Sequence, residues 1–458
     1  MTKTIASPTR GRTIPGPRGN LVLGSIRDIQ RDNIQTFMDA WREYGDIVHF
    51  RGPLAINLVV HPDYVEHVLR HNYKNYPRPD FVADKLKTIV GDGLVGAEGD
   101  QWASSRKKAQ PAFHPKIVES YASAFVETTN ELLDSWSVHA DRGNSIDVKS
   151  EMMHMSLTNL GKTLFKADWS QQVDIVEPIV AGSLAYTNKR LTSPVDPIRF
   201  PLPSTKRFQA GLSVLDTIIY KAIADRRAAT DTDATDLVSI LLNVRDEETG
   251  EGMTDKQIRD EISGFFVAGH ETVSSALTWT WYLLSKHPDV WRRVRAEANE
   301  VIGDRTPTAA DAKALQYINR VLLEAMRLYP PIFVLMRCAT EEDEIGGFHV
   351  PAGANMVLCP YVTHRHTDFW TNPEAFDPDR FLPERAAGLH RMAYFPFSGG
   401  PRKCIGNTFA MLQMPLVVAM VAQRYNLALE PGHEPVIEPA ISLRPRDALP
   451  MYPQRVSA

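Results

Sequence analysis

Cys404 has the most informative neighbours of any residue in this chain. It lies within residues 397–406, where glycines stand before and after it and the cations Arg402 and Lys403 directly precede it. Glycines let a backbone turn tightly and leave its N–H groups free to point at a sulfur atom. Nearby cations, and the positive end of a helix expected to begin at Asn407, favour the thiolate over the thiol. A shielded thiolate of this kind is suited to binding iron, whereas an isolated cysteine would ordinarily be a plain loop residue.

A second set of reactive side chains lies in residues 268–273, Ala-Gly-His-Glu-Thr-Val, in the middle of the longest helical pattern. Glycine inside a helix costs about 1 kcal/mol relative to alanine, so Gly269 is expected to let a flat ligand approach the backbone. Thr272 can donate to the carbonyl of Ala268 and loosen the helix, which leaves room for water. Glu271 can hand protons to that water. The alternative interpretation is that Gly269 is merely a glycine tolerated in the core and that Glu271 is an ordinary surface acid.

Both segments match one family. Residues 397–406 fit the pattern F-x-x-G-x-R-x-C-x-G without a gap, and residues 268–272 fit A/G-G-x-D/E-T. From about Pro15 to its C-terminus, the chain therefore resembles the cytochrome P-450 superfamily of haem-thiolate monooxygenases. The resemblance implies haem b (iron protoporphyrin IX) as the cofactor, with the Cys404 thiolate as the axial iron ligand. Such a ligand pushes electron density toward dioxygen and favours O–O cleavage.

The same resemblance gives roles to the second segment. In the family, the residues that match Thr272 and Glu271 relay protons during oxygen activation, and Ala268 and Gly269 would lie against the haem. Val273 departs from the pattern, which usually ends in a second hydroxyl of accessory role. Peroxide-driven relatives replace the acid and the threonine. The pair therefore favours O2 as the oxidant, with electrons that come indirectly from NAD(P)H.

Further cofactor contacts are also implied by the resemblance. Trp102 and Arg106 match the family's W-x-x-x-R and share a helix face, so an indole N–H and a guanidinium would bind one haem propionate. Arg337 and Arg402 match other propionate ligands, and Phe397 would pack beside the sulfur. Without the resemblance, a half-buried tryptophan and a solvated arginine would be an equally good interpretation of the first pair.

Glu324 and Arg327 form an E-x-x-R pair in an apolar helical run, with both side chains on one face. An exposed ion pair would contribute less than about 1 kcal/mol. The flanking leucines indicate burial, and a buried arginine is paired. Arg380 lies in Phe-x-Pro-x-Arg-Phe, which matches the family segment that completes this network. We expect these three residues to stabilise the fold rather than take part in chemistry.

Four apolar residues are expected to line a substrate pocket: Ile332, Val334, Leu335 and Ile441. An apolar pocket orients ligands weakly and selects them by shape. The expected substrate is therefore a small hydrophobic molecule such as a fatty acid, terpenoid, steroid or polyketide, and the sequence does not choose among them. Taken singly, each of these residues is as readily explained by an ordinary core position.

The pattern of elements predicts a mainly α protein with a small β portion, the cytochrome P-450 fold. Strand-like runs at residues 46–51 and 55–60 indicate a hairpin, and residues 345–358 indicate short strands. A capping box and a following proline delimit a long helix within residues 254–288. The haem would be buried between this oxygen-side helix and the cysteine loop with its helix. Without a linker or repeat, we expect a flexible segment at 1–13 and one haem domain at 14–458.

Composition limits the location and the partners. The net charge of −4 indicates no nucleic acid. Three cysteines form no disulfide framework and fit a reducing cytoplasm. Residues 1–12 contain no apolar run, so we expect them to be neither a signal peptide nor a transmembrane anchor. The fourteen histidines show no zinc-binding spacing.

The predicted activity is insertion of one oxygen atom of O2 into a C–H or C=C bond, that is, hydroxylation or epoxidation. No flavin or iron–sulfur segment is visible, so electrons would come from a ferredoxin or flavodoxin and its reductase, and we expect a monomer. A basic set is predicted to face that partner: Arg106, Lys107, Lys108, Arg402 and Lys403. The alternatives are a peroxygenase or rearrangement catalyst on the same fold and, in another class, a haem-binding protein without turnover.

Overall fold

The computed structural model describes residues 11–20, 24–166, 173–193, 196–229, 235–245 and 250–456, which fall into two compact units. The first unit contains the described parts of Met1–Pro79, Phe333–Glu374 and Leu389–Lys403. The second contains those of Asp80–Ile332, Ala375–Gly388 and Cys404–Ala458. Most of the predicted flexible segment, residues 1–10, lies outside the described residues, and the single domain at 14–458 stays a prediction.

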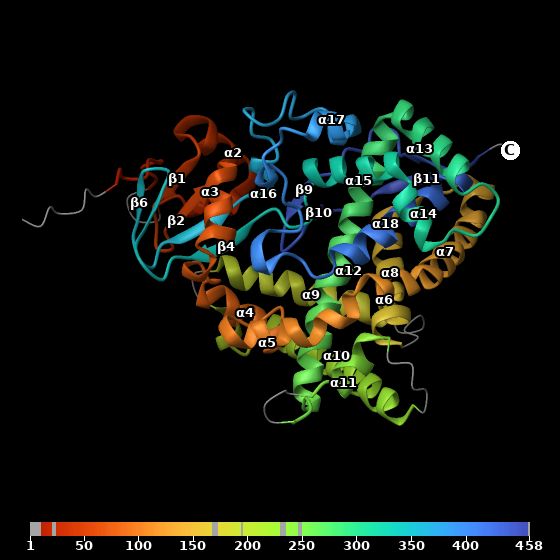
Figure 1. Ribbon diagram of the computed structural model, residues 1–458, viewed down its shortest axis with the longest axis horizontal. Coiled ribbons are helices and arrows are strands. Elements are labelled where there is room, and N and C mark those ends of the chain that lie inside the picture. Colours follow the sequence, from red (N-terminus) through yellow and green to blue (C-terminus); the bar gives the residue numbers. More distant parts are fainter. Residues whose placement is uncertain are drawn as a thin grey trace, which may run out of the picture. The chain divides into compact units, whose positions relative to one another are not determined.

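The first unit is built on a small sheet with short helices (Figure 1). Its α-helices are α1 (Ile26–Arg31), α2 (Asn33–Tyr44), α3 (Pro62–Glu66) and α16 (Pro360–Thr363). It also contains the π-helix η1 (His67–His71) and the 3-10 helices η2 (Tyr73–Asn75), η7 (Arg391–Ala393) and η8 (Gly400–Arg402). Its strands are β1 (Ile47–Phe50), β2 (Ile56–Val59), β4 (Leu335–Cys338), β5 (Asp343–Ile345), β6 (Phe348–Val350) and β7 (Asn355–Leu358).

Four of these strands pair in the order β1-β2-β7-β4, and the predicted hairpin is its β1–β2 edge. Successive side chains of a strand point to opposite faces, and here both faces are covered. Ile47 and Val59 belong to one buried cluster with residues of α3 and η1, whereas Val48 and Leu58 belong to a second cluster with residues of α2. Burial on both faces explains why these strands are apolar almost throughout.

The second unit is mainly helical. Its helices are α4 (Asp80–Val90), α5 (Gly99–Ala109), α6 (Pro115–Ser120), α7 (Ala122–Arg142), α8 (Val148–Leu160), α9 (Val173–Thr192), α10 (Pro203–Ala228), α11 (Leu237–Asn243), α12 (Asp255–Lys286), α13 (Pro288–Val301), α14 (Ala309–Ala314), α15 (Gln316–Leu328), α17 (Pro383–Ala386) and α18 (Asn407–Arg424). It also contains the π-helix η4 (Gly161–Phe165) and the 3-10 helices η3 (Gln110–Phe113), η5 (Pro197–Arg199) and η6 (Pro378–Phe381). Its strands are β3 (Ile146–Asp147), β8 (Tyr425–Leu429), β9 (Ile437–Pro439), β10 (Leu443–Pro445) and β11 (Pro450–Arg455).

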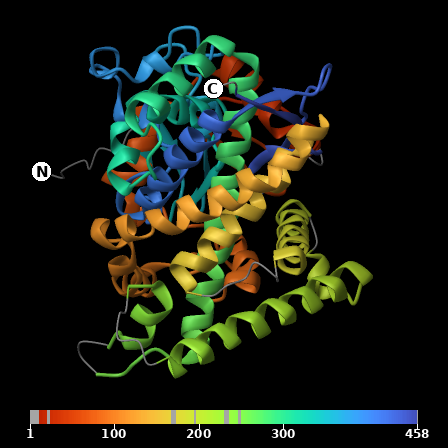
Figure 2. The ribbon, with the colours of Figure 1, turned by 90° about the vertical axis from the view of Figure 1, so that its right-hand side faces the viewer.

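Helix α12 is the predicted long helix, and it passes along α8 through the core of this unit (Figure 1). The side chains of Thr254 and Gln257 form the predicted capping box at its beginning. It ends at Lys286, and Pro288 begins α13, because proline cannot continue a helix but fits its first turn. Figure 2 shows the long helix α10 extending beside α9, and the two helices are in contact.

The lengths and hydropathies of the helices also bear on membranes. Among the described residues, no helix combines the length and the apolar character that a bilayer crossing requires.

Candidate functional site

Helix α12 is buried on nearly all sides, but one stripe of it is open. Ala268 is exposed, and Val267, Gly269 and Thr272 are partly exposed. The other neighbours in this stretch are buried: Phe266, His270, Glu271 and Val273. Thr272 Oγ1 donates to the carbonyl of Ala268 at 2.8 Å, which is the hydrogen bond that the sequence predicted. The residues on both sides of this turn are α-helical, and local loosening of the turn stays a prediction. The open stripe is the part of α12 that a ligand can reach.

The side of Gly269 that lacks a side chain faces a neighbouring helix. A Cβ atom at this position would lie 3.0 Å from Leu160 Cδ2 of α8, and one at Gly264 would lie 3.2 Å from Val95. Both glycines therefore allow close packing of α12 against its protein neighbours. Contact of the Gly269 backbone with a haem stays a prediction.

Glu271 is buried and paired. Its Oε1 accepts a hydrogen bond from Arg444 Nη1 at 2.7 Å, and Arg444 lies on β10. Burial raises the pKa of the Glu271 carboxyl, and the Arg444 charge opposes that rise. Within the described residues no hydrogen bond joins Glu271 to Thr272. The structure thus places the two predicted proton-relay residues next to each other on α12 but engages the acid with a different partner.

Cys404 is exposed and stands just before α18, whose N-cap is Gly406. No side chain caps this helix, so the positive end of α18 stays available to an anion. Burial lowers the pKa of the half-buried Arg106 on α5, and the charge of Cys404 opposes that shift, so the guanidinium lies within electrostatic reach of the sulfur. Trp102 is half-buried on the same helix. These surroundings favour a thiolate.

Phe113 lies beside the cysteine loop, at Gly406, and the sequence did not indicate this. A Cβ atom at Gly406 would lie 3.9 Å from Cys404 Sγ and 4.0 Å from the Phe113 ring. The same ring stacks on Phe265 of α12 with the ring centroids 5.1 Å apart. Phe113 therefore connects the cysteine loop to the oxygen-side helix. Its position between two prolines is its only local signal, and that signal does not indicate a contact partner.

In the first unit, the loop that leads toward the cysteine is tightly constrained. Gly400 has φ +67°, and a Cβ atom there would lie 1.8 Å from the carbonyl oxygen of Leu69 in η1. Only glycine fits such a position, so this glycine serves a contact between backbones. Phe397 and Arg402 are half-buried in this loop, and Arg337 is buried on β4, where its Nη1 donates to the Met336 carbonyl at 2.8 Å. Their roles toward a haem stay predictions.

The three residues of the expected structural network lie together in the second unit. Arg327 on α15 donates to both oxygens of Glu324, from Nε at 2.7 Å and from Nη2 at 2.9 Å. Arg380 on η6 donates from Nε to Glu324 Oε1 at 3.1 Å. Glu324 and Arg327 have no exposed surface. The carboxylate thus joins two segments that are far apart in the chain.

The four predicted pocket residues are all partly exposed. Ile332 and Ile441 belong to the second unit, where the amide of Leu443 donates to the Pro331 carbonyl at 2.8 Å and so holds the β9–β10 hairpin beside residue 332. Val334 and Leu335 belong to the first unit, and each packs against one of its core clusters. Contact with a substrate stays a prediction for all four.

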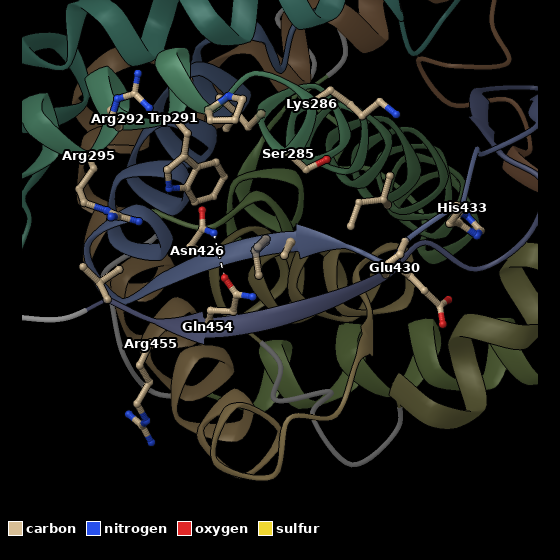
Figure 3. Close-up of a pocket in the computed structure, with 18 of the residues that line it drawn as sticks. Ser285, Lys286, Trp291, Arg292, Arg295, Asn426, Glu430, His433, Gln454 and Arg455 are labelled. Carbon is tan, nitrogen blue, oxygen red and sulfur yellow. Dashed lines mark hydrogen bonds between the residues drawn. The ribbon is translucent and has the colours of Figure 1, made fainter.

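A large cavity elsewhere in the second unit is not this site. It has a volume of about 730 Å³ and lies between strands β8 and β11 and helices α12 and α13 (Figure 3). Asn426 donates to Gln454 at 3.2 Å on its strand side, and none of the predicted site residues lines it. Its size alone therefore does not make it the centre of the expected chemistry.

The residues of the second unit fit a haem bound through a thiolate. Such a cofactor requires a reachable sulfur, an accessible apolar helix face and a cation for a propionate. The chain offers the exposed Cys404 before an uncapped helix, the exposed Ala268 on α12 and the half-buried Arg106 near the sulfur.

Comparisons with known proteins agree with this chemistry. The sequence profile of the family described as cytochrome P450 matches residues 14–449. The cyclooctatin synthase of Streptomyces melanosporofaciens is 35% identical over 93% of this chain and 92% of its own length. The cyclooctat-9-en-7-ol 5-monooxygenase of the same organism is 32% identical over 94% and 93%. The pentalenene oxygenase of Streptomyces avermitilis is 30% identical over 86% and 87%.

A solved structure supports the fold. The crystal structure of the cytochrome P450DA heme domain superposes with a TM-score of 0.88, covers 98% of this chain and 99% of that domain, and is 24% identical. The mainly α architecture with its small sheets is therefore the predicted cytochrome P450 fold. With a profile that spans nearly the whole chain and relatives named for oxygenation, the protein belongs to the cytochrome P450 family and is a cytochrome P450 monooxygenase.

Proposed function

We propose that this enzyme hydroxylates or epoxidises an apolar cyclic substrate of the terpenoid class, with electrons from separate redox proteins. One observation carries the chemistry of the proposal: Cys404 is exposed in front of α18 and within electrostatic reach of Arg106. In the overall reaction, O2, two electrons and two protons convert the substrate into its oxygenated product and one water. When bound, the haem with its thiolate ligand supplies O–O cleavage and the oxidation itself.

The substrate class rests on the relatives. Two of their names denote an unsaturated cyclic alcohol, cyclooctat-9-en-7-ol, and an unsaturated hydrocarbon, pentalenene. Terpenoids are one of the classes that the apolar residues Ile332 and Ile441 allow. A ligand with so few polar groups is held by shape, so the walls of the pocket must fix the carbon that reacts.

The protein's own residues bind the cofactor and move protons. Cys404 would hold the iron, and Trp102, Arg106, Arg337 and Arg402 would bind the propionates. Thr272 holds a water against α12 with its hydroxyl, and Glu271 supplies protons to it. Phe397 shields the sulfur, and Ala268 leaves the helix face open.

The electron donor and the location are part of the same proposal. A ferredoxin or flavodoxin with its NAD(P)H-dependent reductase would dock on the basic set that includes Lys107, Lys108 and Lys403, and their charges would speed its association. The enzyme would act as a monomer in the cytoplasm, and the low cysteine content supports that location.

The first test is the spectrum of the reduced protein with carbon monoxide. We expect the haem-thiolate signature in the wild-type protein and its loss in Cys404→His, because an imidazole replaces the anionic ligand. Cys338→Ser is the matched control, since it removes a thiol on β4, and it should retain the signature. An unchanged spectrum in Cys404→His would refute the ligand assignment.

The second test is the coupling of electrons to product. Thr272→Ala should divert most electrons from NAD(P)H to peroxide while substrate binding persists, because the hydroxyl that holds water is gone. Thr280→Ala is the matched control: Thr280 makes the same kind of bond on α12, donating to the Ala276 carbonyl at 2.7 Å. Full coupling in Thr272→Ala, or turnover with peroxide alone, would favour the peroxygenase instead.

A further inference from the structure

The cavity between β8, β11, α12 and α13 has the size of a small-molecule site and lies wholly within the second unit. Pockets that hold small organic ligands measure roughly 300–1,000 Å³, and this one measures about 730 Å³. Part of its wall is apolar, from Leu284, Pro288, Leu429 and Val456. A ligand that fills the cavity would therefore be partly apolar.

Two residues of α13 stand next to each other on one wall of this cavity. Trp291 and Arg295 are four positions apart and share a helix face, and Figure 3 shows both at the same end of the cavity, near Asn426 of β8. Trp291 is only 3% exposed. Its Nε1 and Arg295 Nη2 are buried atoms, and neither has a hydrogen-bond partner among the described residues. Because an unpaired buried donor costs free energy, this wall lacks an acceptor.

Arg295 also lacks a counter-ion. Its Nε donates to the carbonyl of Ala422, in the last turn of α18, at 2.9 Å. This is the one hydrogen bond that Arg295 makes in the part of the chain that the structure describes. Burial lowers the pKa of Arg295, and no carboxylate opposes that shift. An arginine shielded from water is ordinarily paired with an anion, so one charge at this wall is uncompensated.

The other charged residues around the cavity do not supply that anion. Lys286 and Arg455 each already pair with an exposed carboxylate. Arg292 and Glu430 also line the cavity, and across the described ranges neither takes part in an ion pair. Figure 3 shows Glu430 at the opposite end from Arg295. The end of the cavity at α13 is therefore positively charged.

We propose that this cavity binds a small organic carboxylate with an apolar body, at a site separate from the haem pocket. The carboxylate pairs with the guanidinium of Arg295, with Trp291 Nε1 as the neighbouring donor, and the body packs on the apolar walls. A planar carboxylate suits the fork of a guanidinium. Inorganic phosphate has no apolar body and would leave those walls in contact with water. None of this depends on which substrate the enzyme oxygenates.

The first experiment is calorimetric titration of the holoenzyme with naphthoate, its neutral isostere naphthamide and inorganic phosphate. Naphthoate should bind at least tenfold more tightly than the other two, because naphthamide lacks the charge and phosphate lacks the apolar body. The Soret spectrum should not follow this binding, which separates the site from the haem pocket. Equal affinities, no binding of naphthoate, or a Soret shift that saturates together with the heat would overturn the inference.

Variants of the cavity locate the binding. Arg295→Gln should weaken naphthoate binding at least tenfold, and Arg295→Lys, which keeps the charge but loses the fork, should retain part of it. Arg142→Gln is the matched control, since it removes an exposed arginine from the last turn of α7, and its affinity should equal that of the wild type. Ala428→Phe should also block binding, because Ala428 lies on the same face of β8 as Asn426 and the ring would occupy the cavity. This variant keeps Arg295, so it serves even if Arg295→Gln does not fold.

A purely structural role of Arg295 predicts a different outcome. If Arg295 only holds α13 to the end of α18, Arg295→Gln would lower stability in urea and leave naphthoate affinity unchanged, which would overturn the inference. Unchanged affinity in Ala428→Phe would do the same. The second readout is the indole N–H signal of Trp291 in the NMR spectrum of tryptophan-labelled protein, assigned with Trp291→Phe. It should shift with naphthoate in the wild type and stay unshifted in Arg295→Gln. None of these measurements requires turnover, so their failure is distinct from a failure of the proposed function.

Discussion

His270 and Glu271 are neighbours on α12, and burial acts on their pKa values in opposite directions. Burial disfavours the charged form of either group. It therefore raises the pKa of the acid and lowers that of the histidine, to about 4. Glu271 has Arg444 as a counter-charge, whereas neither ring nitrogen of His270 has a hydrogen-bond partner among the described residues. The imidazole stacks on Phe266 instead, with the ring centroids 6.3 Å apart.

This difference predicts a pH dependence of stability. The folded-state pKa of His270 lies below the ordinary value of 6.5, so its stabilising contribution is complete above pH 6.5 and is lost as the pH falls toward 4. Between pH 7.5 and pH 5 the loss due to this residue should be about 2 kcal/mol. Urea unfolding of wild type, His270→Phe and His270→Gln at both pH values measures it.

Both variants lack the titrating group but differ in shape and polarity. Each should lose about 2 kcal/mol less than the wild type on going from pH 7.5 to pH 5, whatever its stability at the higher pH. If both variants lose as much as the wild type, His270 is not the titrating group.

Several contacts of single residues were predictable because they are local. The hydrogen bond from Thr272 to Ala268 spans one helical turn, and the side chains of Glu324 and Arg327 pair at a spacing that puts them on one helix face. The ion pair of Glu271 with Arg444 was not predictable, because the partners are 173 positions apart. Nothing in the neighbouring sequence of either residue indicates the other.

At the scale of elements, chemical signals at helix ends were reliable. The predicted limits of the long helix agree with α12, since a capping box and a proline act on adjacent residues. The helix expected to begin at Asn407 is α18, which begins at that residue and ends at Arg424. What a glycine in an element faces was not predictable, as Gly269 shows by packing on α8.

The hydrogen bonds of Glu324 allow a prediction of how much this one carboxylate contributes to the stability of the second unit. Glu324 accepts hydrogen bonds from Arg327 of α15, Arg380 of η6 and the amide of Asp377. Glu324→Gln would leave two buried guanidinium groups without an anion, and we expect it to lower the free energy of unfolding by about 3–5 kcal/mol. Denaturation in urea at pH 7 checks this value.

The exposed ion pair between Lys221 and Asp225 provides the control for that experiment. Asp225→Asn should change the free energy of unfolding by less than about 1 kcal/mol, because solvent already screens both charges. An effect of Glu324→Gln as small as that of the control would show that the network does not hold α15 to η6.

At the scale of the whole molecule, the family profile spans segments of both compact units. Each unit interleaves distant parts of the chain: the sheet of the first pairs β2 with β7 in parallel, about 300 residues later. The sequence contained the strands as apolar runs but no signal for their order. Strand order depends on which faces are buried together, and that is decided only when the chain has collapsed.

The amino-acid sequence by itself determined the family, the candidate cysteine ligand, the candidate acid and threonine, and the ends of the main helices. These features are encoded by residue types at short, fixed spacings. Only the tertiary structure decided that Phe113 stands between the cysteine loop and α12, that Gly269 faces α8 and that Arg444 engages Glu271. Such contacts join residues far apart in the chain, and they arise from the packing of whole elements rather than from any local pattern.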